Sequence, residues 1–227
     1  MKPRGSVICL SFLVIGWSAG WAAGSPVNLL SNASFETGDL TGWTMDGPNG
    51  GYGVLADGAT IPGVTYSGYV PSYQNVRGGS FGAYAVTAGT AQEYVSFSQS
   101  LDLAAGPYTA SFYMGNDQGG MFGIGTAIGE GLLGIRVNGS PIPFRSAYEN
   151  NFPTGSSPAD FTLFEADFRL PDAASTLIEF RISGSGLERT GISVDDFGVV
   201  AVPAPGAIFL GAIGAGLVGW LRRRRTL

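Results

Sequence analysis

Apolar and polar residues alternate over short runs along most of the chain, and this pattern limits the fold more than any other feature of the sequence. The clearest runs span 93–103, 107–114, 161–170, 176–183 and 191–200. Weaker ones span 27–30, 52–56, 81–87 and 132–137. A period of two residues places the apolar side chains on one face of a β-strand. About nine to eleven half-buried strands predict an all-β jelly-roll or related sandwich of two antiparallel sheets.

The amino-terminal segment 1–24 has the layout of a secretory signal peptide. Lys2 and Arg4 precede an apolar stretch over 7–17, and small residues then lead to an expected cleavage after Gly24 or after Ala22. The alternatives are an uncleaved anchor and a buried helix. Because the charge, the apolar length and the small residues agree, we predict a cleaved signal helix and export of the protein.

Residues 25–201 are then the mature domain, and this part of the chain is strongly acidic. It contains six arginines, no lysine and all 17 acidic residues, which gives a net charge of −11. Such a surface repels phosphate groups, so we expect no nucleic acid partner. About 175 residues suffice to build a hydrophobic core without disulfides.

The residue types that carry most enzyme chemistry are missing from the mature domain. The chain has no histidine, and its single cysteine, Cys9, lies in the leader. These absences exclude His-dependent triads, disulfides and metal sites built from Cys or His. Carboxylate pairs can serve a glycosidase, but nothing in the sequence selects one pair. We therefore predict a non-catalytic protein, with a glycan hydrolase as an alternative.

Two stretches at the ends of the domain resemble a known family. Residues 28–43 read NLLSNASFETGDLTGW, and residues 194–197 read VDDF. Both are similar to the opening and the last strand of galactose-binding-like β-sandwich domains, a group that includes several carbohydrate-binding module families. The resemblance is strong only at these two ends, and it implies a galactose-binding-like sandwich whose first and last segments meet.

That meeting suggests a structural calcium site. Glu36 follows the opening stretch and Asp195 and Asp196 lie in the last strand, and carboxylate and carbonyl oxygens suit a hard cation such as Ca²⁺. The resemblance implies the same site. Strict alternation puts Asp196 on the face opposite Asp195 and Phe197, so one aspartate suffices as a direct ligand, and which one is left open. Otherwise Glu36 caps a turn and the aspartates face solvent.

The candidate ligand face lies in residues 64–77, VTYSGYVPSYQNVR. Tyr66, Tyr69, Tyr73 and Arg77 are close in sequence there, and aromatic rings beside polar groups suit sugar binding. The alternative is that the tyrosines only pack, with their hydroxyls outward. Trp43, the one tryptophan outside the leader and the tail, is expected in the core.

The carboxyl-terminal segment 202–227 has three parts. The apolar stretch 206–221 contains five glycines and would form about 24 Å of helix, which is short for a stable transmembrane helix of about 20 residues. Before it stands a Pro-x-Pro motif, and after it an arginine cluster: Val202, Pro203 and Pro205, then Arg222, Arg223, Arg224 and Arg225.

This layout resembles the PEP-CTERM sorting signal of exopolysaccharide-producing Gram-negative bacteria, with Ala204 where the namesake motif has glutamate. The resemblance implies an exosortase-type membrane protease as a partner, which removes the transmembrane helix. The alternative is a permanent anchor. Taken together, the sequence predicts an exported, non-catalytic protein of the cell surface or exopolysaccharide matrix that binds extracellular polysaccharide. The other alternative is a purely structural or adhesive matrix protein.

Overall fold

A computed structural model describes the parts of the chain that build the sandwich. These are residues 27–47, 51–62, 76–87, 94–116, 131, 133–145, 161–183, 190–203, 213–214 and 216–218. The expected signal helix over 1–24 lies outside the described residues, as does most of the expected transmembrane helix over 206–221. Within the described part of the chain, no helix is long and apolar enough to cross a membrane.

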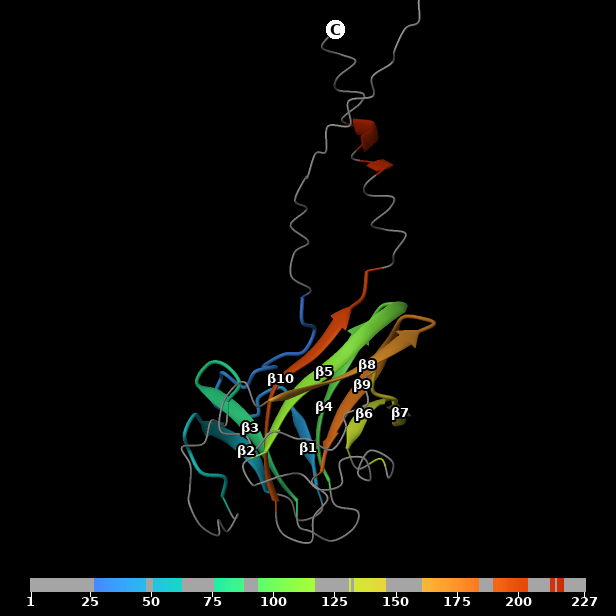
Figure 1. The fold of residues 1–227 in the computed structure, drawn as a ribbon. Helices are drawn as coiled ribbons and strands as arrows, with labels where there is room; N and C mark the ends of the chain where they lie inside the picture. Colours follow the sequence, from blue (N-terminus) through green and yellow to red (C-terminus); the bar gives the residue numbers. More distant parts are fainter. Residues whose placement is uncertain are drawn as a thin grey trace, which may run out of the picture.

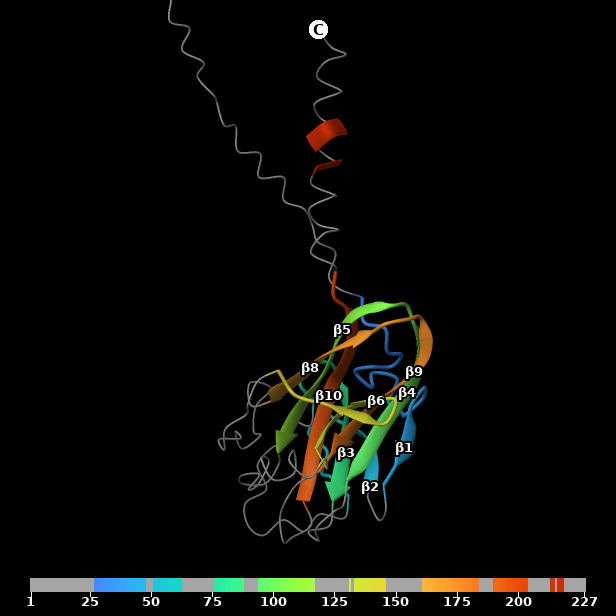
Figure 2. The same ribbon diagram turned by 90° about the vertical axis from the view of Figure 1, so that its right-hand side faces the viewer.

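The described residues form ten strands in two five-stranded antiparallel sheets (Figures 1 and 2). Sheet A has the order β1-β4-β9-β6-β7 and sheet B has the order β2-β3-β10-β5-β8. The strands are β1 (Thr44–Asp46), β2 (Gly51–Ala56), β3 (Phe81–Thr87), β4 (Val95–Leu103), β5 (Gly106–Asn116), β6 (Gly134–Val137), β7 (Ser140–Ile142), β8 (Thr162–Leu170), β9 (Ala174–Ile182) and β10 (Thr190–Ala201). The predicted all-β sandwich is therefore confirmed.

The strand predictions hold wherever the alternation is long. All five clear runs form strands, namely β4, β5, β8, β9 and β10, and the weaker runs at 52–56, 81–87 and 132–137 correspond to β2, β3 and β6. The run at 27–30 is not a strand. Instead, the Leu29 amide donates one hydrogen bond to the Val199 carbonyl, and the Asn28 side chain bonds the backbone of Phe197 and Val199. The three-residue strands β1 and β7 were not predicted.

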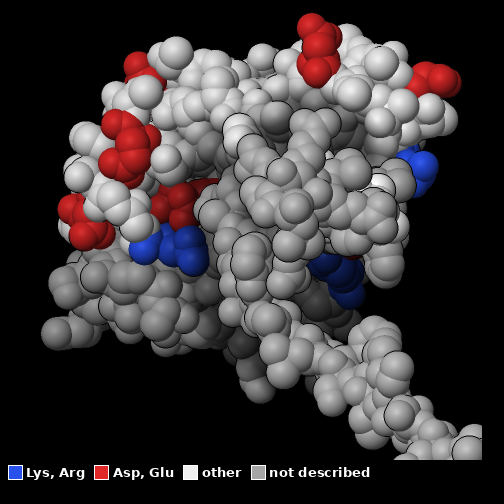
Figure 3. Space-filling view, turned by 90° about the horizontal axis from the view of Figure 1, so that it is seen from above, with Lys and Arg blue, Asp and Glu red and all other residues white. Residues whose placement is uncertain are grey.

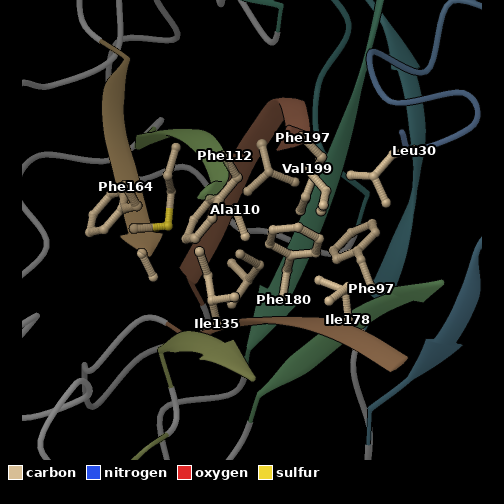
Figure 4. Close-up of a cluster of buried hydrophobic side chains, with 14 of the residues drawn as sticks. Leu30, Phe97, Ala110, Phe112, Ile135, Phe164, Ile178, Phe180, Phe197 and Val199 are labelled. Carbon is tan, nitrogen blue, oxygen red and sulfur yellow. The ribbon is translucent and has the colours of Figure 1, made fainter. Parts of the chain in front are cut away.

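The core between the sheets is rich in aromatic rings (Figure 4). Phe197 of β10 lies at its centre, and its ring centroid is 4.7 Å from that of Phe180, 5.0 Å from that of Trp43 and 5.3 Å from that of Phe97. These rings come from both sheets and from the first turn. Edge-to-face and tilted pairs of this kind add to the stabilisation from buried apolar area.

Trp43 has the core position expected from the sequence. Its side chain is buried, its ring stacks on Phe35 at 5.6 Å, and its indole nitrogen donates a hydrogen bond to the Asn32 carbonyl. Phe35 is fully buried although its φ of +57° lies in the left-handed region, which a bulky residue rarely adopts. Burial of the Phe35 ring among aromatic neighbours therefore offsets strain in the backbone of this turn.

The two ends of the sandwich differ. Val27 and Pro203, where the described domain begins and ends, lie at the same end (Figure 1). The pairing of Leu29 with Val199, and of the Val202 amide with the Pro107 carbonyl, holds both connections there. Strand ends on the opposite side, such as Thr87 and Asn116, pair with the beginning of β10.

We expect Phe197→Ala to lower the free energy of unfolding by about 3–5 kcal/mol, because it removes the ring shared by both sheets and leaves a cavity. Urea denaturation measures this change. Leu177→Ala is the matched control: that side chain is 40% exposed on β9, and its loss should change the stability by less than about 1 kcal/mol. Equal effects of the two substitutions would contradict a core centred on Phe197.

Candidate functional site

Carboxylates from both ends of the domain hold the backbone of residues 76–81. Glu36 accepts hydrogen bonds from the Ser80 amide at 3.0 Å and from the Phe81 amide at 3.1 Å. Asp195 accepts one from the Arg77 amide at 2.8 Å. The predicted meeting of the first turn with the last strand is therefore seen, with the segment before β3 bound between them.

A β-bulge directly follows Asp195 in β10. Val194 and Phe197 both point into the core, and the pairing with β5 shifts register between Asp195 and Gly198. Asp196 is the extra residue of this bulge, and its φ is +48°. Strict alternation would have put Asp195 and Phe197 on one face. That expectation is wrong. Asp195 lies on the outer face of sheet B, still in register with Tyr113, and the bulge after it returns Phe197 to the core.

Asp195 is a fully buried carboxylate held by amide donors. Burial, followed by the negative charge of Asp196, raises its pKa to about 7, against the hydrogen bonds from the amides of Arg77, Asp196 and Gly78. The Asp196 amide donates to the second oxygen at 2.8 Å. Both oxygens of this carboxylate therefore have donors.

Arg77 closes the cluster from outside. Its guanidinium donates to Asp196 at 2.6 Å, and its central carbon lies 3.6 Å from the centre of the Tyr113 ring of β5. The Arg77 side chain is still 38% exposed. Stacking and the ion pair fix the plane of the guanidinium, and the side chain as a whole stays partly exposed.

The three carboxylates predicted for calcium do not fit the ion as they are placed. Glu36 and Asp195 accept hydrogen bonds from backbone amides, and Asp196 is paired with Arg77. N–H donors therefore occupy the positions that a cation would take beside these carboxylates. Among the described residues, no group of three or more His, Cys, Asp or Glu side chains is arranged for a metal. Calcium binding itself stays an untested prediction.

The predicted ligand residues are only partly described. Arg77 lies on the outer face of sheet B as given above, whereas Tyr66, Tyr69 and Tyr73 lie outside the described residues. In the predicted sorting motif, Val202 and Pro203 are exposed at the end of β10, and Pro205 and the four arginines at 222–225 lie outside the described residues.

Sheet A carries a separate polar cluster on its outer face. Glu179 of β9 accepts a hydrogen bond from Arg181 at 2.7 Å and lies 3.7 Å from the Arg136 side chain of β6. The Arg181 guanidinium lies 4.0 Å from the centre of the Tyr94 ring. Beyond this cluster, an open hollow of about 310 Å³ is lined by Arg136, Leu133, Phe144 and neighbouring apolar residues.

The end of the molecule at Val27 and Pro203 is seen face-on in Figure 3. Acidic side chains are spread over its described surface, and basic side chains form only a few small groups. This distribution agrees with the net charge of −11 over residues 25–201 and offers no broad basic area on the described part of this face.

Sequence reasoning missed Tyr113. The residue faces outward in β5 because its neighbours Phe112 and Met114 point into the core. The alternation in 107–114 contains that signal, since an aromatic residue at an outward position is free to stack on a cation. Its partner Arg77 could not be inferred, because the two residues are brought together by sheet pairing.

No protein-family model and no characterised protein sequence matches this chain. Several solved structures resemble the fold. TmCBM61, a carbohydrate-binding module solved with β-1,4-galactotriose, is 16% identical with a TM-score of 0.39 over 78% of this chain and 99% of that chain. The CBM22-1 xylan-binding domain of Paenibacillus barcinonensis Xyn10C is 17% identical with a TM-score of 0.45 over 81% of this chain and 99% of that chain.

The arabinose-bound α-L-arabinofuranosidase MgGH51 is 14% identical, with a TM-score of 0.49 over 79% of this chain and only 27% of that chain. At such low identities, and with TM-scores below 0.5, these likenesses assign neither a family nor a ligand to this protein. The sandwich architecture rests on the strands and sheet pairing described above.

The raised pKa of Asp195 predicts a pH-dependent stability. An unfolded aspartate titrates near pH 4, so the contribution of Asp195 to the stability of the fold is largest below that pH. The contribution is lost as the pH rises towards about 7, the pKa of folded Asp195, and stays lost above it. The loss amounts to up to about 4 kcal/mol.

Urea denaturation of the wild-type protein and of Asp195→Asn between pH 4 and 8 measures this term as the difference between the two curves. We expect the stability of the wild-type protein, relative to that of Asp195→Asn, to fall as the pH rises from 4 to about 7 and then to stay level. Asp196→Asn keeps Asp195 titratable but removes the neighbouring charge, so its curve should fall less steeply than the wild-type curve. Parallel curves for all three proteins would refute the raised pKa.

Proposed function

We propose that this protein is an exported, non-catalytic carbohydrate-binding protein of the cell surface or exopolysaccharide matrix. The observation that supports it most is Arg77, a partly exposed side chain whose guanidinium is fixed by Asp196 and stacked on Tyr113. Its planar set of N–H donors is suited to the hydroxyl or carboxylate oxygens of a sugar. The tyrosine-rich stretch over 64–75 leads directly into it.

The binding site we propose joins Arg77 to Tyr66, Tyr69 and Tyr73 of that stretch. Aromatic rings cover the apolar faces of sugar rings, and a fixed cation beside them supplies direction and specificity. The backbone bonds from Glu36 and Asp195 to residues 76–81 hold the base of the stretch to the rigid sandwich. A fixed base lowers the entropy lost when a ligand is bound.

We expect Arg77→Ala to weaken binding to the cell's own extracellular polysaccharide by at least about tenfold, because the fixed donors are lost. Arg77→Lys should also weaken it, since lysine keeps the charge but not the planar donor set. Arg169→Ala, on the exposed face of β8, is the control with the same change of charge and should bind normally. Pull-down on the purified polysaccharide and a glycan array are the assays.

The outcomes separate the candidate functions. If the wild-type protein retains no glycan in either assay, carbohydrate binding is refuted and a purely structural or adhesive role replaces it. If the wild-type protein binds but Arg77→Ala binds equally well, the function stands and the Arg77 site is wrong. Release of reducing ends from the polysaccharide by the wild-type protein would support the hydrolase alternative.

Processing at both ends is part of the proposal. The leader at 1–24 would be removed on export, and the tail at 202–227 would be recognised by an exosortase-type protease in the membrane. The exposed Val202 and Pro203 support this, because a protease must reach an extended junction.

Mass spectrometry of the mature protein isolated from its host tests the processing. We expect a mass that lacks the leader at 1–24 and the apolar stretch 206–221 with its arginine cluster. An intact carboxyl terminus would show a permanent anchor instead, and an intact amino terminus would exclude cleavage of the leader.

A further inference from the structure

The two sheets end in four edge strands among the described residues: β1 and β7 in sheet A, and β2 and β8 in sheet B. An edge strand presents backbone N–H and C=O groups that can pair with another chain, and proteins usually protect them. Three of these four edges carry such protection.

Prolines protect β7. Ser140 pairs with Val137 across a two-residue turn, so the residues at 141 and 143 are those whose backbone groups point away from β6. Both are prolines, which have no N–H to donate. β1 is protected by its length of only three residues.

The backbone and the side chain of Arg145 protect β8. The Arg145 amide donates to the Glu165 carbonyl at 2.8 Å along the outer side of this strand. The Arg145 guanidinium then pairs with Glu165 at 2.6 Å and with Asp167 at 3.4 Å. The backbone bond and the two ion pairs together cover this part of the edge.

β2 carries none of these devices. Its sequence, GYGVLA, has no charge and no proline, and its register with β3 is unbroken over all six residues. The Asp57 amide donates to the Ser80 carbonyl across the ladder at 3.0 Å. By alternation, the backbone groups of Tyr52, Val54 and Ala56 therefore point away from β3.

Apart from the Ala56 carbonyl, these outward groups have no backbone hydrogen-bond partner in the described part of the chain. The only outward backbone bond there is from the Ala59 amide to the Ala56 carbonyl, at 3.1 Å. The amides of Tyr52, Val54 and Ala56 donate no backbone hydrogen bond to any described residue. Tyr52 is also 38% exposed, and it is the one exposed aromatic side chain among the described residues.

We propose that β2 is a self-association edge, where a second copy of this chain adds its own β2 antiparallel and joins the two B sheets into one. A two-fold axis at Val54 pairs Val54 with the partner's Val54, and Tyr52 with the partner's Ala56. The N–H groups of Val54 and Ala56 then meet the C=O groups of the partner's Val54 and Tyr52. The Tyr52 N–H becomes a second donor to the partner's Ala56 C=O, which also accepts from its own Ala59 amide. The Tyr52 ring lies over the small alanine, an aromatic cross-strand contact.

A second copy fits this edge better than a foreign peptide for two reasons. The outward groups are spaced symmetrically about Val54, so the edge is complementary to itself. It also carries no charge that would select a partner of opposite sign. Since the net charge of residues 25–201 is −11, long-range repulsion opposes the dimer, and added salt should strengthen it.

The expected dimer is weak, because one strand pair buries less than the roughly 1,600 Å² of a standard stable interface. Its consequence is multivalency. Two domains joined at β2 present two copies of any ligand face, and linked sites bind a polymeric ligand more tightly than a single site does. The dimer does not depend on what that ligand is.

Analytical ultracentrifugation of the full chain in mild detergent, at low and at high salt, tests the proposal. We expect a monomer–dimer equilibrium that shifts to dimer with salt. Ala56→Pro removes one outward N–H without removing a bond to β3, and should raise the dissociation constant at least about tenfold. Ala56→Ser keeps that N–H and is the matched control, expected to associate as the wild type does.

Cysteine cross-linking tests the register. In a Cys9→Ser background, Val54→Cys places two sulfurs across the two-fold axis, where paired Cα atoms lie about 5.5 Å apart, within disulfide range. Mild oxidation should link this variant rapidly. Leu177→Cys, exposed on sheet A, should not be linked at that rate.

Either experiment can overturn the proposal. A wild-type chain that stays monomeric at high salt contradicts it, as does an Ala56→Pro chain that associates like the Ala56→Ser chain. Equal cross-linking of the Val54→Cys and Leu177→Cys chains would also contradict pairing at β2. Circular dichroism and thermal melts confirm that each variant is folded, so a loss of association is not read from a misfolded chain.

Discussion

The β-bulge in β10 is the local feature on which the rest of the arrangement depends. It lets Val194 and Phe197 both enter the core, although they are three positions apart in the sequence, while Asp195 stays on the outer face. Phe197 then joins the rings of both sheets, and its amide donates to the Ala33 carbonyl of the first turn. A single extra residue thus links the core, the first turn and the outer face of sheet B.

The same bulge explains how the segment before β3 is attached. Asp195 accepts a hydrogen bond from the Arg77 amide, and Asp196 accepts one from the Arg77 guanidinium. Glu36 accepts from the amides at the other end of the segment. Charged carboxylates that accept amide bonds form stronger contacts than neutral pairs do. This segment, which adjoins the proposed ligand residues, is therefore held by direct bonds to the first and last parts of the domain.

Sequence reasoning predicted the long strands well and the local geometry poorly. The runs that form β4, β5, β8, β9 and β10 are long enough for the two-residue period to be clear. The bulge breaks that period by one residue, so alternation misplaced Asp195 relative to Phe197. The short strands β1 and β7 contain too few residues to show a period at all.

In the candidate site, too, the sequence predicted which segments meet but not the contacts between them. The resemblance of the two ends to sandwich domains correctly predicted that the first turn meets the last strand, where the Phe197 amide donates to the Ala33 carbonyl. Side-chain types alone suggested a cation between the carboxylates, because the backbone amides that meet them, those of Arg77, Ser80 and Phe81, are invisible in a sequence. The stacking of Arg77 on Tyr113 likewise depends on strand order, which the pattern of residues does not specify.

Glu36 and Asp195 bind the backbone of residues 76–81 directly, with no ion between them. Amide hydrogen exchange of Arg77, Ser80 and Phe81, measured in EDTA and again in excess calcium, tests it. We predict slow exchange of all three amides, comparable to that of neighbouring β10 amides and equal in the two conditions. Fast exchange in EDTA that becomes slow only with calcium would contradict the claim and would show that a metal ion holds this segment.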